Sequence, residues 1–93
     1  MMTLRFTLHA TQRMFERQIS TDDVRRVLES GELIASLPDR MPVPSYTVLG
    51  FINGRPVHVI YVAGERDERF VITVYDPSEH PELWSDDYRR RVK

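Results

Sequence analysis

The sequence contains no cysteine, and this absence limits both the fold and the chemistry. Disulfides, thiolate metal sites, iron–sulfur clusters and a cysteine nucleophile are all excluded. No apolar stretch approaches the roughly 18–20 residues that a membrane-spanning helix needs. The longest one, residues 57–63, is interrupted by His58. These absences predict a cytoplasmic protein that makes no contact with a membrane.

Lysine is nearly absent as well, because only Lys93 of the 13 basic residues is a lysine. Arginine carries a planar, permanently charged group that suits phosphate, although a GC-rich genome also favours arginine. The formal net charge of −1 excludes a uniformly basic surface for nucleic acid but not a local basic face. With 93 residues, of which 41% are hydrophobic and 29% charged, the chain is expected to form one globular domain over residues 1–93.

The first thirty residues carry the pattern of a helical hairpin. Thr7 can cap the first helix, and Ser20 or Thr21 can begin the second, which Gly31 would end. The apolar residues of the first helix recur every four positions and are Phe6, Ala10 and Met14.

From residue 32 onward the hydrophobic period falls to two, which indicates strands over 33–37, 46–52, 55–63 and 70–75. Asn53-Gly54 predicts a two-residue hairpin turn that places Leu49 opposite His58. In the last strand, Phe70, Ile72 and Val74 are expected to face away from the residues between them. Residues 38–45, with three prolines, are expected to be irregular.

These patterns predict an α+β fold in which two N-terminal helices pack on an antiparallel meander of about four strands. A short helical turn is expected over residues 81–88, near the C-terminus. The strand over residues 33–37 is expected to be an edge strand and therefore a place where a protein partner could bind.

His9, Arg13 and Arg17 form the first candidate site. Their four-residue spacing places them within an arc of roughly 80° on one helix face. One imidazole and two guanidinium groups on one stripe can bind phosphate. The alternative is a solvated face on which Glu16 pairs with one of the arginines.

The strands supply further candidates. His58 interrupts an apolar strand that begins at Arg55, and it is either a functional group or a buried core histidine. Tyr75 ends the last strand before a proline-containing loop, where it faces a cleft or packs as an aromatic residue. The terminal run Arg89, Arg90 and Arg91, together with Arg55, is predicted to bind RNA phosphates, and the alternative is that the run is simply solvated.

These residue types favour phosphodiester cleavage without a metal ion. Histidine can remove the 2′-hydroxyl proton of RNA or protonate the leaving oxygen, and arginine can stabilise the charge that develops on phosphate. A metal site would require His9, His58 and His80 to converge, and no ligand-spaced motif supports that. No cofactor is therefore expected.

The order of these motifs resembles the family described as domain of unknown function 4258. The residues that match lie in three blocks. They are His9-Ala10, Arg13-Met14, Arg17 and Ile19-Ser20, then Gly54-Arg55-Pro56 with His58-Val59, then Ile72 to Tyr75 with Pro77, Trp84 and the Arg89–Arg91 end. The sequence departs from the pattern of this family in two ways. Gln18 stands where the family often has glycine, and lysine is scarce, although RelE-like enzymes use it.

This resemblance implies a RelE-like fold, related to the BrnT and MqsR toxins, and the toxin role in a type II toxin–antitoxin pair. The implied substrate is mRNA, and the implied partner is a cognate antitoxin, for which the resemblance suggests a zinc-finger protein of the MqsA type. By the same resemblance His9, Arg13, Arg17, His58 and Tyr75 become catalytic candidates.

Two other functions stay open from the sequence. The first is a non-catalytic module of the same fold that binds a protein or nucleic acid. The second is a small-ligand or metal-dependent enzyme, which rests on the three histidines alone.

Overall fold

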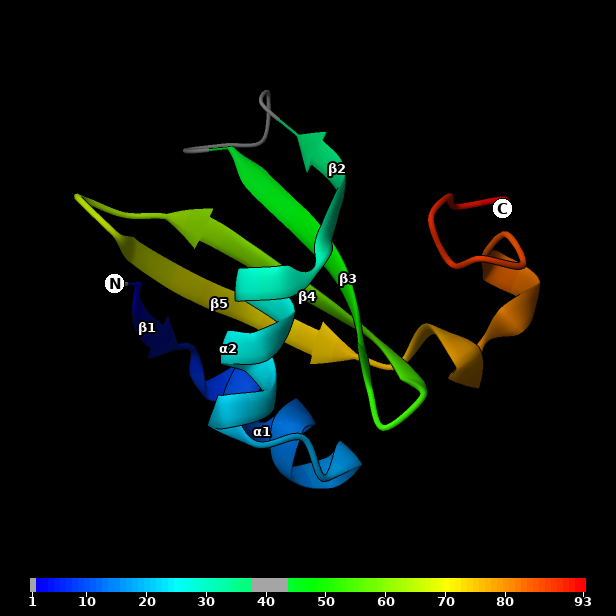
Figure 1. The fold of residues 1–93 in the computed structure, drawn as a ribbon, viewed down its shortest axis with the longest axis horizontal. Coiled ribbons are helices and arrows are strands. Elements are labelled where there is room, and N and C mark those ends of the chain that lie inside the picture. The colour runs from blue at the N-terminus through cyan, green and yellow to red at the C-terminus, as the bar shows by residue number, and fades with distance from the viewer. Residues whose placement is uncertain (1, 38–43) are drawn as a thin grey trace.

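The computed structural model describes residues 2–37 and 44–93. Their five strands form one sheet in the order β1-β5-β4-β3-β2, and both helices pack on the same face of it (Figure 1). The strands are β1 (Thr3–Phe6), β2 (Glu32–Leu37), β3 (Ser45–Ile52), β4 (Arg55–Ala63) and β5 (Glu68–Tyr75), and the helices are α1 (Leu8–Arg17) and α2 (Thr21–Ser30). The mixed α+β class and the predicted helical hairpin are therefore confirmed.

Local signals in the sequence determine where both helices begin. The Thr7 hydroxyl accepts the backbone N–H of Ala10 at 3.0 Å and caps α1. Ser20 and Asp23 cap α2 reciprocally, each side chain accepting the backbone N–H of the other residue. Gln18 ends α1 in the left-handed conformation (φ 56°), which is the conformation that glycine adopts most easily.

The hairpin between β3 and β4 has the predicted register. Asn53 and Gly54 both have positive φ angles, 53° and 81°, as a two-residue turn of this type requires. Leu49 lies opposite His58 in the antiparallel ladder. Leu49 and His58 therefore share the sheet face that points away from the helices.

The expectation of about four antiparallel strands is wrong, because β1 adds a fifth strand that runs parallel to β5. Phe6 belongs to this strand, where it pairs with Val71, and not to the first helix. Its four-residue spacing from Ala10 imitated the helical period, and a strand of four residues is too short to show a period of its own.

The predicted alternation of the last strand is also wrong. A bulge shifts the ladder so that Ile60 pairs with Thr73 while Tyr61 pairs with Val71. Val71 and Val74 are both fully buried on the helix side of the sheet. The bulge thereby leaves Thr73 on the opposite face.

The C-terminal segment differs from the helical turn expected over residues 81–88. It contains two short 3-10 helices, η1 (Pro77–Glu79) and η2 (Pro81–Leu83), each beginning with a proline. A single bridge then joins Trp84 to Arg91. The segment packs on His58, so it covers the end of the sheet face that the helices leave free.

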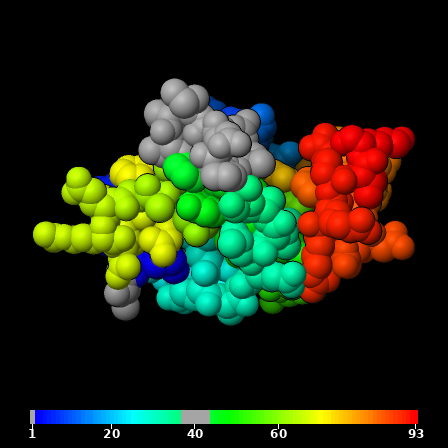
Figure 2. All heavy atoms as spheres, turned by 90° about the horizontal axis from the view of Figure 1, so that it is seen from above, coloured from blue at the N-terminus to red at the C-terminus, as the bar shows by residue number. Residues whose placement is uncertain are grey.

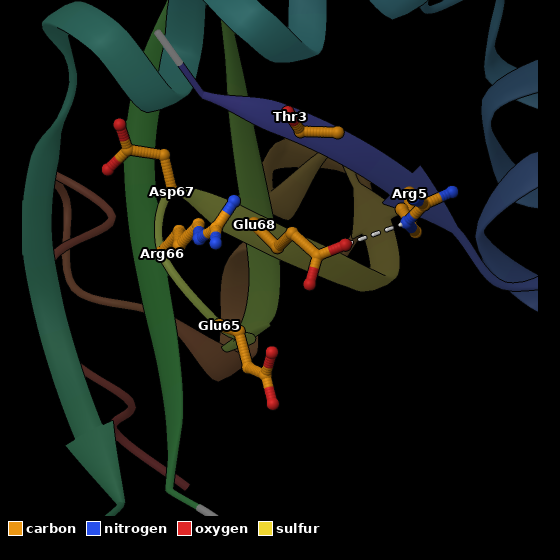
Figure 3. Close-up of a pocket in the computed structure, with 6 residues that line it drawn as sticks. All are labelled: Thr3, Arg5, Glu65, Arg66, Asp67 and Glu68. Atoms are coloured by element: carbon orange, nitrogen blue, oxygen red, sulfur yellow. Dashed lines mark hydrogen bonds and ion pairs between the residues drawn. The ribbon is translucent and has the colours of Figure 1, made fainter.

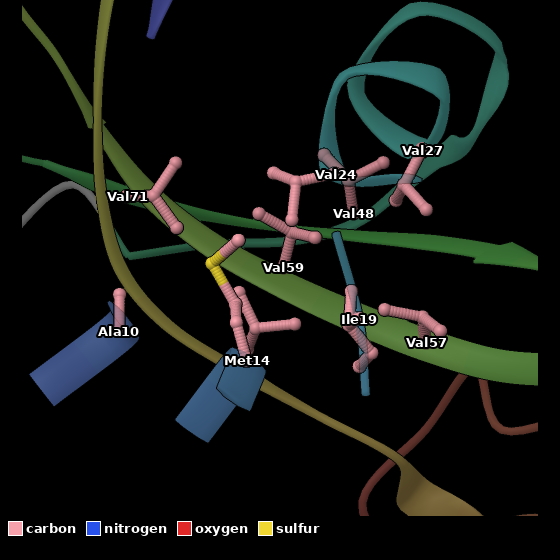
Figure 4. Close-up of a cluster of buried hydrophobic side chains, with 10 residues drawn as sticks. Ala10, Met14, Ile19, Val24, Val27, Val48, Val57, Val59 and Val71 are labelled. Carbon is pink, nitrogen blue, oxygen red and sulfur yellow. The ribbon is translucent and has the colours of Figure 1, made fainter. Parts of the chain in front are cut away.

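The main core lies between the helices and the sheet (Figure 4). Gly50 of β3 lets α2 approach closely, because a Cβ atom at this position would lie 2.8 Å from a methyl carbon of Val27. The buried members are Ala10, Met14, Ile19, Val24, Val27, Val48, Val57, Val59, Val71 and Val74. Most of the residues predicted to be irregular, 38–43, lie outside the described part of the chain.

Candidate functional site

A cleft of about 310 Å³ opens where α1, the C-terminal end of β5 and the C-terminal segment meet. We call it the β5-end cleft. It mixes cationic, acidic and aromatic side chains with a few apolar ones. The residues that line it are Arg17, Ile60, Tyr75, Asp76, Pro77, Glu79, His80, Leu83, Trp84 and Arg91.

Arg17 is the residue of α1 that reaches this cleft. Glu79 of η1 accepts from its guanidinium at 3.1 Å, and Glu16 does so at 3.3 Å. Arg13, one turn earlier, instead donates to Glu16 at 2.7 Å and does not line the cleft. This hydrogen bond is the main reason that the pKa of Glu16 is lowered. Both arginines thus make ion pairs, but only Arg17 faces the cleft.

His9 lies beside the cleft and not in its lining. Its Nε2 atom is 3.1 Å from the Thr73 hydroxyl, and the imidazole is exposed. Thr73 and Tyr75 share one face of β5, because they are two residues apart in a regular part of the strand. His9 therefore contacts β5 two residues before Tyr75, which lines the cleft.

His58 is fully buried and both of its ring nitrogens are hydrogen-bonded. Its Nε2 atom lies 2.9 Å from the Tyr88 carbonyl, which can only accept, so Nε2 carries the hydrogen. Nδ1 must then accept from the Tyr75 hydroxyl at 3.1 Å. Burial lowers the pKa of His58, and the Tyr88 carbonyl and the Asp76 charge oppose this only in part.

This environment gives His58 the position of a core histidine. The Trp84 ring packs edge-on against it with centroids 4.5 Å apart. A substrate could reach the imidazole only if the C-terminal segment moved away. The predicted role of His58 in contact with substrate thus has no support in this geometry.

Tyr75 links the buried histidine to the cleft. Its hydroxyl donates to His58, while the residue also lines the β5-end cleft. Burial raises the pKa of Tyr75, and the positive charge of Arg91 offsets this in part. At neutral pH the phenol is therefore protonated, and its proton is directed at His58.

The arginines predicted to bind RNA do not form one surface. Arg55 lies on the helix side of the sheet, 3.7 Å from the buried Asp76 carboxylate. Arg89 is held by Glu32 of β2 at 2.9 Å, and the C-terminal residues gather beside β2 at one end of the molecule (Figure 2). The side chain of Arg90 is exposed and pairs with no described residue.

Arg91 is the member of this run that lines the cleft. Its guanidinium lies 5.6 Å from the centre of the Trp84 ring, at the range of a cation–π contact. The bridge between Trp84 and Arg91 holds the backbone at both positions. The indole thus supports a guanidinium at the wall of the cleft.

His80 also lines the cleft, and the sequence analysis considered it only as a possible metal ligand. Its side chain is 65% exposed, with Nδ1 3.7 Å from the Glu82 carboxylate. It stands between two 3-10 helices, where no strand or helix period marks its direction. Within the described residues no cluster of three or more His, Asp or Glu side chains could hold a metal ion.

A larger cavity, of about 570 Å³, opens beside the turn between β4 and β5 (Figure 3). Arg5 of β1 pairs there with Glu68 at 3.0 Å. The lining carries charges of both signs and contains none of the predicted site residues. It consists of Thr3, Arg5, Glu65, Arg66, Asp67 and Glu68.

A family model described as "Domain of unknown function (DUF4258)" matches residues 6–76. The chain belongs to this family. The match contains His9, Arg17 and Tyr75, whereas it ends before the C-terminal segment that forms the outer wall of the cleft. No match was found among curated proteins or among solved structures. Among the described helices, none is long and apolar enough to cross a membrane.

Proposed function

We propose that this chain of the DUF4258 family is the toxin of a type II toxin–antitoxin pair and that it cleaves RNA without a metal ion. One observation carries the proposal. Arg17 of α1, Tyr75 of β5 and Arg91 of the C-terminal segment are distant in sequence, yet they line the same cleft. The RelE-like fold, an mRNA substrate and an antitoxin partner of the MqsA type are parts of the same proposal.

The cleft suits a phosphodiester because it offers two guanidinium groups and a tyrosine. Arg17 and Arg91 bind the phosphate oxygens and stabilise the charge that builds up on them as the 2′-oxygen attacks phosphorus. His9, beside the cleft on Thr73, is placed to transfer a proton. Tyr75 and Trp84 offer aromatic surface for a neighbouring base.

Glu79 opposes phosphate binding in the free protein. It occupies the guanidinium of Arg17 at 3.1 Å, and a bound phosphate would take its place. The ion pair holds the Arg17 side chain, which is 22% exposed, in position before RNA arrives. We therefore expect Arg17 to contribute more to RNA cleavage than Arg13, which pairs with Glu16 and does not line the cleft.

The test is induced expression in a bacterial host, with growth and total RNA followed together, and cleavage of RNA by the purified protein in EDTA. Arg17→Ala should abolish growth arrest and slow cleavage by about 10²-fold or more. Arg26→Ala is the matched control, because Arg26 forms an exposed pair with Asp23 on α2, away from the cleft. Equal toxicity of both variants, with both proteins folded, would contradict the proposed site.

A non-catalytic binding module is the second candidate, and the outer face of α1 favours it. Leu8 and Phe15, two turns apart on this helix, are 74% and 86% exposed. Large apolar side chains exposed together often mark a protein interface. A stable complex with a partner protein, with RNA intact under every condition, would favour this function over cleavage.

A further inference from the structure

RNA cleavage without a metal ion requires two proton transfers. A base takes the 2′-hydroxyl proton as its oxygen bonds to phosphorus, and an acid protonates the 5′-oxygen as the bond from phosphorus to that oxygen breaks. The products are a 2′,3′-cyclic phosphate and a 5′-hydroxyl end. His9 can supply only one of these transfers at a time, so the proposed reaction needs a second group.

We propose that His80 is this second group, an inference that rests on the proposed function. Of the three histidines in the chain, His58 is buried with both nitrogens bonded, and His9 stands beside the cleft. His80 is the histidine that lines the cleft. Its exposed imidazole is open to a bound substrate.

The backbone around His80 is fixed by local contacts. Asp76 caps η1 by accepting from both the N–H and the hydroxyl of Ser78, at 2.8 and 2.6 Å. The His80 N–H donates to the Pro77 carbonyl at 3.2 Å, and Pro81 restricts the residue that precedes it. These contacts thus hold the backbone at His80.

His80 shares the cleft with Arg17, the arginine proposed to bind phosphate. Glu79, the preceding residue, holds Arg17, and both Arg17 and His80 line the cleft. Glu82 contacts Nδ1, which leaves Nε2 without a partner among the described residues. The charged and titratable groups that line the cleft with His80 are Arg17, Tyr75, Asp76, Glu79 and Arg91, and Glu82 lies beside the imidazole.

The experiment compares the purified wild type with His80→Gln on a short RNA substrate across a range of pH. The variant should lower kcat by about 10²- to 10⁴-fold and remove one limb of a bell-shaped pH profile. Its affinity for the same oligonucleotide with 2′-deoxyribose should stay within about twofold, since the arginines that bind phosphate remain. His80 is exposed, so thermal unfolding should be unchanged.

A substrate with sulfur in place of the 5′-oxygen then separates the two roles, because this leaving group needs no proton. Recovery of the variant on this substrate identifies His80 as the acid, and continued loss identifies it as the base. A variant with the wild-type rate and profile overturns the role of His80 while leaving RNA cleavage intact. A wild type that cleaves no RNA overturns the proposed function, and the inference with it.

Discussion

Acid should destabilise this fold through His58. The imidazole is fully buried, and burial lowers its pKa below the ordinary value of 6.5. As the pH falls through 6.5, the unfolded chain therefore binds a proton that the folded chain does not accept. Stability from this residue is fully present above pH 6.5 and is lost as the pH falls toward the folded-state pKa.

The size of the effect follows from this linkage. Between the two pKa values, each pH unit lowers the free energy of unfolding by about 1.4 kcal/mol. One kcal/mol shifts the Tm of a domain of this size by roughly 4–8 °C. Acidification below pH 6.5 should thus lower the Tm, and the decrease from this residue ends once the pH is below the folded-state pKa.

Thermal unfolding of the wild type and His58→Gln between pH 7.5 and 5 measures the effect. Glutamine can donate to the Tyr88 carbonyl and accept from Tyr75, but it does not titrate. The difference in slope between the two proteins isolates His58 from the exposed His9 and His80. Trp84, the single tryptophan, reports on the same contact by fluorescence. Equal slopes would refute the argument.

Two further substitutions test the cleft and the packing. Glu79→Gln should strengthen RNA binding a few-fold and steepen its salt dependence by about one phosphate contact, because Arg17 loses its pairing with Glu79. Filter binding at several salt concentrations measures both quantities. Weaker binding by the variant would contradict the expectation. Gly50→Ala should lower the free energy of unfolding by about 1–3 kcal/mol, because the added methyl group meets Val27 at 2.8 Å. Urea unfolding measures this, and an unchanged midpoint would show that α2 moves away without cost.

Local signals in the sequence predicted much of the fold. The caps at Thr7 and Ser20 and the turn at Asn53-Gly54 act within a few residues, so their effects could be predicted without tertiary information. β1 could not be predicted in this way, since its pairing partner lies more than sixty residues away at Glu68 to Val71. The bulge in β5 is likewise a property of the paired strands, and the hydrophobic pattern of residues 70–75 in the sequence does not reveal it.

Some of the residues that line the cleft were predicted as site residues from the sequence, but their assembly was not. Arg17, Tyr75 and Arg91 were chosen from separate patterns, and only the fold shows that they line one cleft. The same patterns selected Arg55, which lies on the other sheet face, and His58, which is buried. Residue type signals chemistry, whereas access to solvent depends on which segment covers which face.

The pairing of β1 with β5 has a consequence for synthesis on the ribosome. The first strand emerges early and then has no partner until residues 68–71 follow. The strands β2 to β4 are neighbours in sequence and can pair while translation continues. The cleft forms later still, because it needs η1, η2 and Arg91. A nascent chain therefore carries an incomplete sheet until residues 68–71 have emerged, and it gains its cleft only after Arg91 has emerged.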